Sequence, residues 1–232
     1  MAEKTDVHEM TPLVPAEPQR PLLRGVFHLA GLFVALVAGA LLVLGSDSAK
    51  HGAKHVVAAA VFAASVVVML GASALYHRVT WTPRVRPWMR RVDHAGIYFL
   101  IAGSYTPVGL LVLHGWLQVV VLAVVWTGAA AATILNFCWV GGPKWLSAGI
   151  AIAIGWVGIV ALPQLLHAVG VVPVLLIAAG GIAYTVGGVV YARRKPDPVP
   201  FVFGYHELFH ALTLVALALQ YVAFTFFVIR VA

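Results

Sequence analysis

Residues 205–229 read YHELFHALTLVALALQYVAFTFFVI, an almost uninterrupted apolar run that opens with two histidines four positions apart. A run of about 20 apolar residues is long enough to cross a bilayer as an α-helix. Ionisable residues inside such a span are costly unless they are paired or functional. Positions i and i+4 share one face of a helix, so His206 and His210 could bind one metal ion together. The stretch therefore predicts a membrane helix that carries part of a metal site.

The whole chain has the composition of a membrane protein. Of its 232 residues, 62% are hydrophobic and 10% are charged, whereas a soluble domain is typically about 45–50% apolar and ~25% charged. The net charge of +7 does not indicate nucleic-acid binding, because the cations fall in the connections between apolar runs. The single cysteine, Cys138, excludes an internal disulfide. We predict a polytopic membrane protein with no nucleic-acid partner.

Seven apolar runs of membrane-spanning length follow a polar, proline-rich start. We therefore predict an all-α fold in which residues 1–24 form a disordered cytoplasmic tail and residues 25–232 form one seven-transmembrane-helix domain. The predicted spans are residues 25–44, 56–77, 93–113, 116–140, 145–166, 171–191 and 205–229.

The cations predict the orientation of these spans. With the N-terminus in the cytoplasm, twelve of the fifteen lysines and arginines fall on the cytoplasmic side, and only Lys50, Lys54 and Arg230 fall outside. Connections rich in lysine and arginine stay in the cytoplasm. We therefore expect a cytoplasmic N-terminus and, after seven spans, a C-terminus outside.

Three predicted spans carry polar residues at their cytoplasmic ends. The second span ends with Ser73 and His77 on one face, the third begins at Asp93, and the seventh supplies His206 and His210. Three neutral imidazoles with one open position are a ligand set of catalytic zinc, which lowers the pKa of a bound water toward ~7. We predict Zn²⁺ bound by the three histidines. Asp93 would accept the proton of that water or hold it in place, and Ser73 would hydrogen-bond Asp93 or a ligand.

The residues leave alternatives open for these assignments. Asp93 opens its predicted span, so it could be a helix N-cap, or it could bind the metal directly and close the site. Ser73 could serve helix packing alone. His94 follows Asp93 by roughly 100° around a helix, so we expect it to point elsewhere.

Residues 206–210 also match the H-E-x-x-H pattern of zinc proteases, in which the glutamate is the general base. An intramembrane metalloprotease is therefore an alternative. It is less favoured because Asp93 already offers an acid or base, and because Ser73 and His77 have no place in such a site. We expect Glu207 to face the headgroups or the arginine-rich loops instead.

Four segments resemble the motifs of the bacterial haemolysin III family: SALYH at 73–77, DHAGIY at 93–98, AGSYTP at 102–107 and HELFH at 206–210. That family belongs with the progestin and adipoQ receptors, and more distantly with the alkaline ceramidases. The resemblance covers all seven predicted spans. It implies zinc bound by His77, His206 and His210, with Asp93 and Ser73 completing the site. It also implies a multi-pass protein of the bacterial inner (plasma) membrane with a cytoplasmic N-terminus.

The three-histidine site with its adjacent carboxylate favours a zinc-dependent hydrolase of a membrane lipid amide or ester near the inner leaflet. The resemblance implies a ceramidase-like activity and a role in membrane-lipid homeostasis. The alternative is a non-catalytic seven-span sensor or receptor in which zinc staples three helices. A pore-forming haemolysin is less favoured, because no predicted span has a charged face through its middle. Membrane lipid is the expected partner. The glycine pairs at 180–181 and 187–188 leave a homo-oligomer open.

Overall fold

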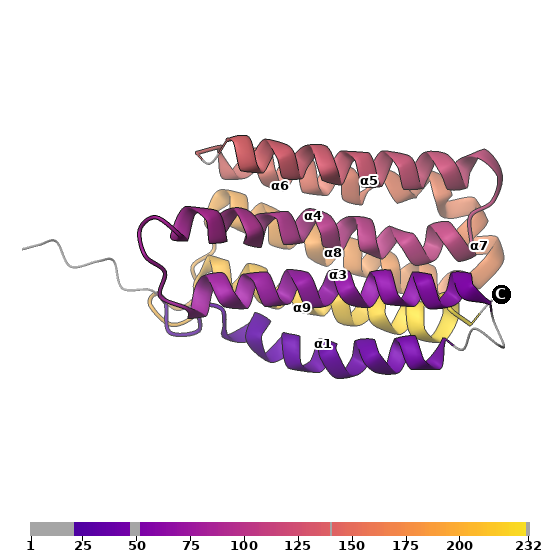
Figure 1. Cartoon of the computed structure of the whole chain (residues 1–232), viewed down its shortest axis with the longest axis horizontal. Helices are drawn as coiled ribbons and strands as arrows, with labels where there is room; N and C mark the ends of the chain where they lie inside the picture. Colours follow the sequence, from indigo (N-terminus) through magenta and orange to yellow (C-terminus); the bar gives the residue numbers. More distant parts are fainter. Residues whose placement is uncertain (1–20, 47–51, 140, 231–232) are drawn as a thin grey trace, which may run out of the picture.

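A computed structural model describes residues 21–46, 52–139 and 141–230. Most of the predicted tail and the last residue of the predicted fourth span, Val140, lie outside these residues. The described chain forms seven long helical segments that run side by side along the long axis of the molecule (Figure 1). They are α1 (Val26–Gly45), α3 (Ala53–Arg78), α4 (Arg86–Leu111), α5 (Gly115–Cys138), α6 (Lys144–Gly155) with a 3₁₀ helix (Val157–Ala161) and α7 (Leu162–Val169), α8 (Val171–Arg193), and α9 (Tyr205–Ala223) with a π-helical end (Phe224–Val228).

Six of the seven segments are long and apolar enough to cross a membrane, and α4 is the exception. It has 26 residues, but its first two turns carry Arg86, Arg90 and Arg91. In Figure 1 it lies between α3 and α5, and it contacts both. Eleven of its residues are buried, Asp93 and Ser104 among them, so much of the helix faces protein, where polar residues are tolerated better than in lipid. The predicted all-α membrane bundle is confirmed.

The segments pack into a closed ring. Going around it, α1 contacts α3, α3 contacts α4, α4 contacts α5, α5 contacts α6, α6 contacts α8, α8 contacts α9, and α9 returns to α1. The first and last helices of the chain are therefore neighbours. This closure brings residues near the N-terminus beside the start of α9.

The third long helix begins earlier than the predicted span. The helix begins at Arg86, seven residues before Asp93, with Val85 as its N-cap. Pro87 stands in the first turn, where its missing N–H costs nothing. Arginine is a good helix former, so the helix continues beyond the apolar run that marked the span. Asp93 thus lies about two turns inside α4, and its N-cap interpretation is wrong.

The predicted fifth span is not one continuous α-helix. It breaks after Gly155 into the 3₁₀ helix and α7, where Pro163 stands in the first turn and cannot continue a preceding helix. The Tyr105 hydroxyl, from α4, donates to the Gly155 carbonyl at 2.6 Å and accepts from the Gly158 N–H at 2.7 Å. A side chain from another helix therefore satisfies the backbone groups that the break exposes.

Glycines of α8 let neighbouring helices approach closely within the bundle. A Cβ at Gly180 or Gly187 would meet α9, and one at Gly188 would meet Ile152 of α6. These positions therefore serve packing inside one chain. A homo-oligomer remains a prediction.

Candidate metal centre

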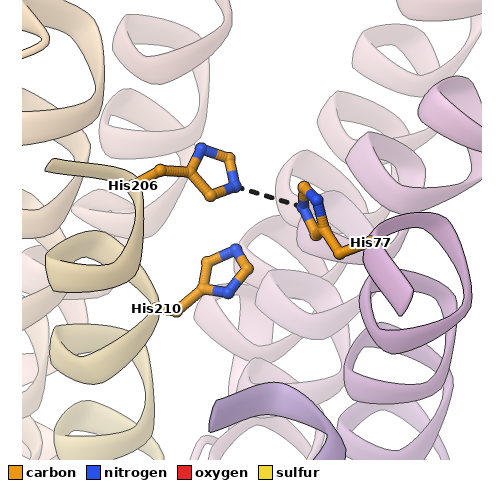
Figure 2. Close-up of side chains that lie close together, drawn as sticks. All are labelled: His77, His206 and His210. Atoms are coloured by element: carbon orange, nitrogen blue, oxygen red, sulfur yellow. Dashed lines mark hydrogen bonds between the residues drawn. The ribbon is translucent and has the colours of Figure 1, made fainter. Parts of the chain in front are cut away.

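Three histidines converge at one end of the bundle, the end expected to be cytoplasmic. His77 comes from the last turn of α3, and His206 and His210 come from the first turns of α9. Each offers a nitrogen within 4.8 Å of the other two, and the Nε2 atoms of His77 and His206 are 3.1 Å apart. Figure 2 shows the three rings turned toward a common space. Within the described residues this is the one group of three such side chains that could hold a metal ion.

Asp93 lies beside this group without belonging to it. Its Oδ2 atom is 3.7 Å from Nε2 of His77, and the residue is 8% exposed. Direct ligation would require a carboxylate oxygen close to all three ligand nitrogens, and the group within mutual reach contains only the histidines. The position leaves Asp93 next to the metal site, where it can meet a molecule bound there.

Ser73 lies one turn before His77 on α3 and is 1% exposed. Its side chain interacts with the Asp93 carboxylate, and its Oγ is 2.8 Å from Nδ1 of His28. A hydroxyl can donate one hydrogen bond and accept another, so Ser73 can hydrogen-bond Asp93 and His28 at the same time. Ser73 thereby links α1, α3 and α4 at the site.

His28, on α1, lies at the candidate site and was not predicted from the sequence. It is buried, and its ring stacks on that of His210 with centroids 3.7 Å apart and planes 7° from parallel. One signal could have found it, since His28 is an ionisable residue inside the first apolar run and such residues are usually paired or functional. It stands in the first apolar run, outside the three predicted spans whose polar ends indicated the site.

The chain just before α1 covers the site on the side where His28 lies. Arg24 donates from Nε to Oε1 of Glu207, between the two ligands of α9. Gly25 has a φ of +75°, and a Cβ there would lie 2.5 Å from the Cβ of His77. Through Gly25 and His28, this turn of chain lies against His77 and His210.

The expected position of Glu207 is wrong. The residue is fully buried, so it does not face headgroups, and its cation is Arg24 rather than one from the arginine-rich loop. Its second oxygen, Oε2, accepts the Gly204 N–H at 3.0 Å and caps the start of α9. Both carboxylate oxygens are thus engaged in holding the fold. This arrangement disfavours the protease alternative, which needs Glu207 as a free base.

His94 and Tyr191 stand nearby but outside the ligand group. Nε2 of His94 lies 3.4 Å from the Tyr191 hydroxyl, and the Tyr191 ring packs 5.7 Å from that of His206. His94 is therefore outside the group of histidines that could hold a metal ion, although it lines the same cavity as Asp93.

A cavity of about 370 Å³ extends from the metal centre into the bundle. At one end it is lined by His206, His210 and Asp93, and at the other by Gln220 and Phe224. From His206 to Phe224 the helix advances by roughly 27 Å at 1.5 Å per residue, close to the ~30 Å of the bilayer core. Most of the wall between these ends is apolar, with side chains such as Leu100, Ile101, Val108, Ile177 and Leu165.

Comparison with known proteins places the chain in a family. The family model described as Haemolysin-III related matches residues 17–221. Hemolysin-3 of Bacillus cereus is 33% identical over 203 residues, which cover 87% of this chain and 90% of the relative. The Hemolysin-3 homolog of Bacillus subtilis (strain 168) is 30% identical over 202 residues, which cover 87% of this chain and 92% of the relative. With its apolar helices and these relatives, the chain is a multi-pass protein of the bacterial plasma membrane, and it belongs to the haemolysin III family.

Proposed function

We propose that this protein is a zinc-dependent hydrolase that cleaves an amide or ester bond of a membrane lipid near the inner leaflet. One observation carries the proposal: three histidines that can hold a metal ion, with a carboxylate beside them, lie at the end of an apolar cavity of nearly membrane length. The cavity suits an alkyl chain, and the polar end suits the bond that joins the chain to its headgroup.

The donor set fits zinc. His77, His206 and His210 supply three imidazole nitrogens, the ligands that zinc takes in many catalytic sites with a fourth position left open. Two of these nitrogens are already 3.1 Å apart, a separation that neighbouring ligands of one small ion require. When bound, the ion would polarise a carbonyl and activate a water molecule.

Asp93 is placed to act as the general base and acid. Its carboxylate, 3.7 Å from His77 Nε2, can take a proton from the attacking water and return it to the leaving amine or alcohol. In the overall reaction the carbonyl carbon gains the water oxygen, the carbon–nitrogen or carbon–oxygen bond breaks, and the leaving group gains the proton. Ser73, held by His28, fixes the orientation of Asp93 through its hydroxyl.

The geometry supports chemistry over a purely structural metal. A structural zinc normally has four protein ligands, whereas the group within reach here has three, with Asp93 outside it. The sensor or receptor alternative requires Asp93 to complete the set. The two proposals therefore differ in what removal of the Asp93 carboxylate does to metal content.

The test compares metal content and turnover in purified protein. We expect one zinc per chain, and Asp93→Asn should keep it while hydrolysis of a panel of long-chain amides and esters, ceramides included, falls roughly 10²–10⁴-fold. Asp197→Asn is the matched control, because Asp197 only accepts the Tyr205 N–H at 2.8 Å and an asparagine oxygen can do the same. Loss of zinc from Asp93→Asn would favour the structural staple and defeat the catalytic assignment.

A further inference from the structure

We propose that the cavity contains a second polar site, about 15 Å from the metal centre along the helices, which hydrogen-bonds a hydroxyl group on the alkyl chain of the bound lipid. The site consists of Ser104 on α4, Tyr184 on α8 and Gln220 on α9, all of which line the cavity. We call it the mid-cavity polar site. The inference rests on the proposed function, because it assumes that an alkyl chain occupies the cavity.

These three side chains are unusual because their polar atoms are buried and unpaired. The hydroxyls of Ser104 and Tyr184 and Oε1 of Gln220 have no hydrogen-bond partner among the described residues. Another cavity residue, Thr213, shows the usual behaviour, since its hydroxyl donates to the Phe209 carbonyl at 2.9 Å. Buried polar groups nearly always have partners, and polar residues at membrane depth are costly without a function.

Two of the three residues lie at the same depth. Ser104 follows Asp93 by 104 − 93 = 11 residues on α4, and Gln220 follows His210 by 220 − 210 = 10 residues on α9. At 1.5 Å per residue these are advances of roughly 16 and 15 Å from the metal centre. Each residue faces the cavity together with the metal-centre residue of its own helix, so the two converge on the same space.

Tyr184 reaches this level from the opposite direction. It precedes Tyr191 by 191 − 184 = 7 residues, so it lies roughly 10 Å deeper along α8. Side chains lean toward the N-terminus of their helix, which for α8 is the end away from the metal centre (Figure 1). The Tyr184 hydroxyl therefore leans toward the depth of the other two residues.

Packing contacts agree with this placement. Tyr184 packs against a cluster that contains Leu100, one turn from Ser104, and Leu217, three residues from Gln220. One turn beyond Tyr184, a Cβ at Gly180 would lie 3.3 Å from Cγ of Gln220. The three polar residues thus belong to one neighbourhood of the cavity wall.

The donors and acceptors of the site select a hydroxyl. The Gln220 oxygen only accepts, whereas the hydroxyls of Tyr184 and Ser104 donate and accept. A chain hydroxyl can donate to Gln220 and accept from Tyr184 at once. A carbonyl or ether oxygen only accepts and leaves the Gln220 oxygen unpaired, and a plain methylene chain pairs with none of the three polar groups. An extended chain advances about 1.2 Å per bond, so the hydroxyl would lie roughly 12 bonds from the bond that is cleaved.

The experiment measures binding, which does not depend on turnover. Zinc-loaded full-length protein in lipid nanodiscs is equilibrated with radiolabelled palmitic acid, which is then displaced by stearic, 2-hydroxystearic or 12-hydroxystearic acid. We expect 12-hydroxystearic acid to displace the label at a concentration roughly 5- to 10-fold lower than stearic acid, as one or two net hydrogen bonds would give. The 2-hydroxy acid carries its hydroxyl at the metal end, so it should show no such gain.

Single-atom and near-isosteric variants tie the preference to the site. Tyr184→Phe and Gln220→Leu should abolish the preference for the 12-hydroxy acid and bind stearic acid at least as well as the unchanged protein. Thr213→Val is the matched control, because its hydroxyl is already paired with the Phe209 carbonyl, and it should retain the preference. Unchanged zinc content shows that each variant has folded.

Three results would overturn the inference in distinguishable ways. Equal displacement by stearic and 12-hydroxystearic acid would show that the mid-cavity polar site does not bind a chain hydroxyl. The proposed function, with a lipid chain in the cavity, would be unaffected by that result. A preference that survives both Tyr184→Phe and Gln220→Leu would place the recognition elsewhere. No saturable binding of any fatty acid would defeat the proposed lipid function, and this inference with it.

Discussion

Replacement of Gly25 by alanine tests whether the chain before α1 positions the metal ligands. Gly25 has a φ of +75°, and an added Cβ would lie 2.5 Å from the Cβ of His77. Carbon atoms in contact are about 3.5–4.0 Å apart, so either α1 or the end of α3 must move by roughly 1 Å or more. His77 stands at this contact, so a movement of α3 carries a ligand with it.

The cost has two parts. A non-glycine residue in the left-handed region loses roughly 1–2 kcal/mol, and overpacking a tight contact adds typically 1–3 kcal/mol. We expect Gly25→Ala to lose about 2–4 kcal/mol of stability by the sum of these two effects. We also expect zinc affinity to fall roughly 10- to 100-fold, the usual effect of disturbing groups that orient a ligand.

Gly170→Ala is the control for backbone strain without a new contact. Its φ of +79° also disfavours a side chain, with a ψ of −176° against −2° at Gly25, and no heavy atom of the described chain lies within 4 Å of an added Cβ. It should therefore lose only the backbone part of the stability and retain full zinc affinity. Thermal unfolding gives the stability of each variant, and competition with a zinc chelator gives its affinity.

The reasoning fails if both alanine variants retain full zinc affinity. Unchanged zinc affinity in Gly25→Ala would show that the contact between Gly25 and His77 relaxes without moving the ligand. The start of α1 would then cover the site without positioning it.

Four further predictions concern the metal ligands, the residues beside them and the orientation of the chain in the membrane. His206→Ala and His210→Ala should each lose zinc, and full retention by metal analysis would refute the ligand assignment. His28→Phe keeps a ring to stack on His210 but loses the hydrogen bond to Ser73, so chelator competition should show nearly normal zinc affinity. His28→Ala should bind zinc about 10-fold more weakly or worse, because it also loses the stacked ring. Equal zinc affinities of the two variants would show that the stacking plays no role. Glu207→Gln should keep zinc but lose about 1–3 kcal/mol in thermal unfolding, because Arg24 loses its carboxylate; unchanged stability with no activity would revive the protease alternative. A reporter fused after the last residue should lie outside the cytoplasm, and a cytoplasmic signal would contradict the predicted orientation.

The fold was predictable because each membrane helix can be recognised from its own stretch of sequence. Length and hydropathy of a single run decide whether it spans the bilayer, and this held for six of the seven segments. The start of α4 was missed because its first two turns are polar yet helical. The break after Gly155 was missed because the hydroxyl that stabilises it comes from Tyr105, on another helix.

The difference between local sequence patterns and contacts from distant parts of the chain also explains which parts of the site could be predicted. His206 and His210 share one helix face, and the predicted depth of His77 matched theirs, so spacing and topology together indicated the metal site. His28, Arg24 and Gly25 lack such a pattern, because each acts on one residue from a distant part of the chain. Glu207 was misplaced for the same reason, since its partner Arg24 lies 183 positions away in the sequence.

The contacts around α1 link formation of the metal centre to closure of the bundle. His77 is on α3 and the other two ligands are on α9, helices that lie on either side of α1 in the ring. The first turn of α1 and the residues before it contact both sides through Gly25, His28 and Arg24. A ligand that binds only the closed arrangement stabilises it by mass action. The bound metal would therefore hold α3 and α9 together across α1, and the residues that position the ligands are also those that complete the ring.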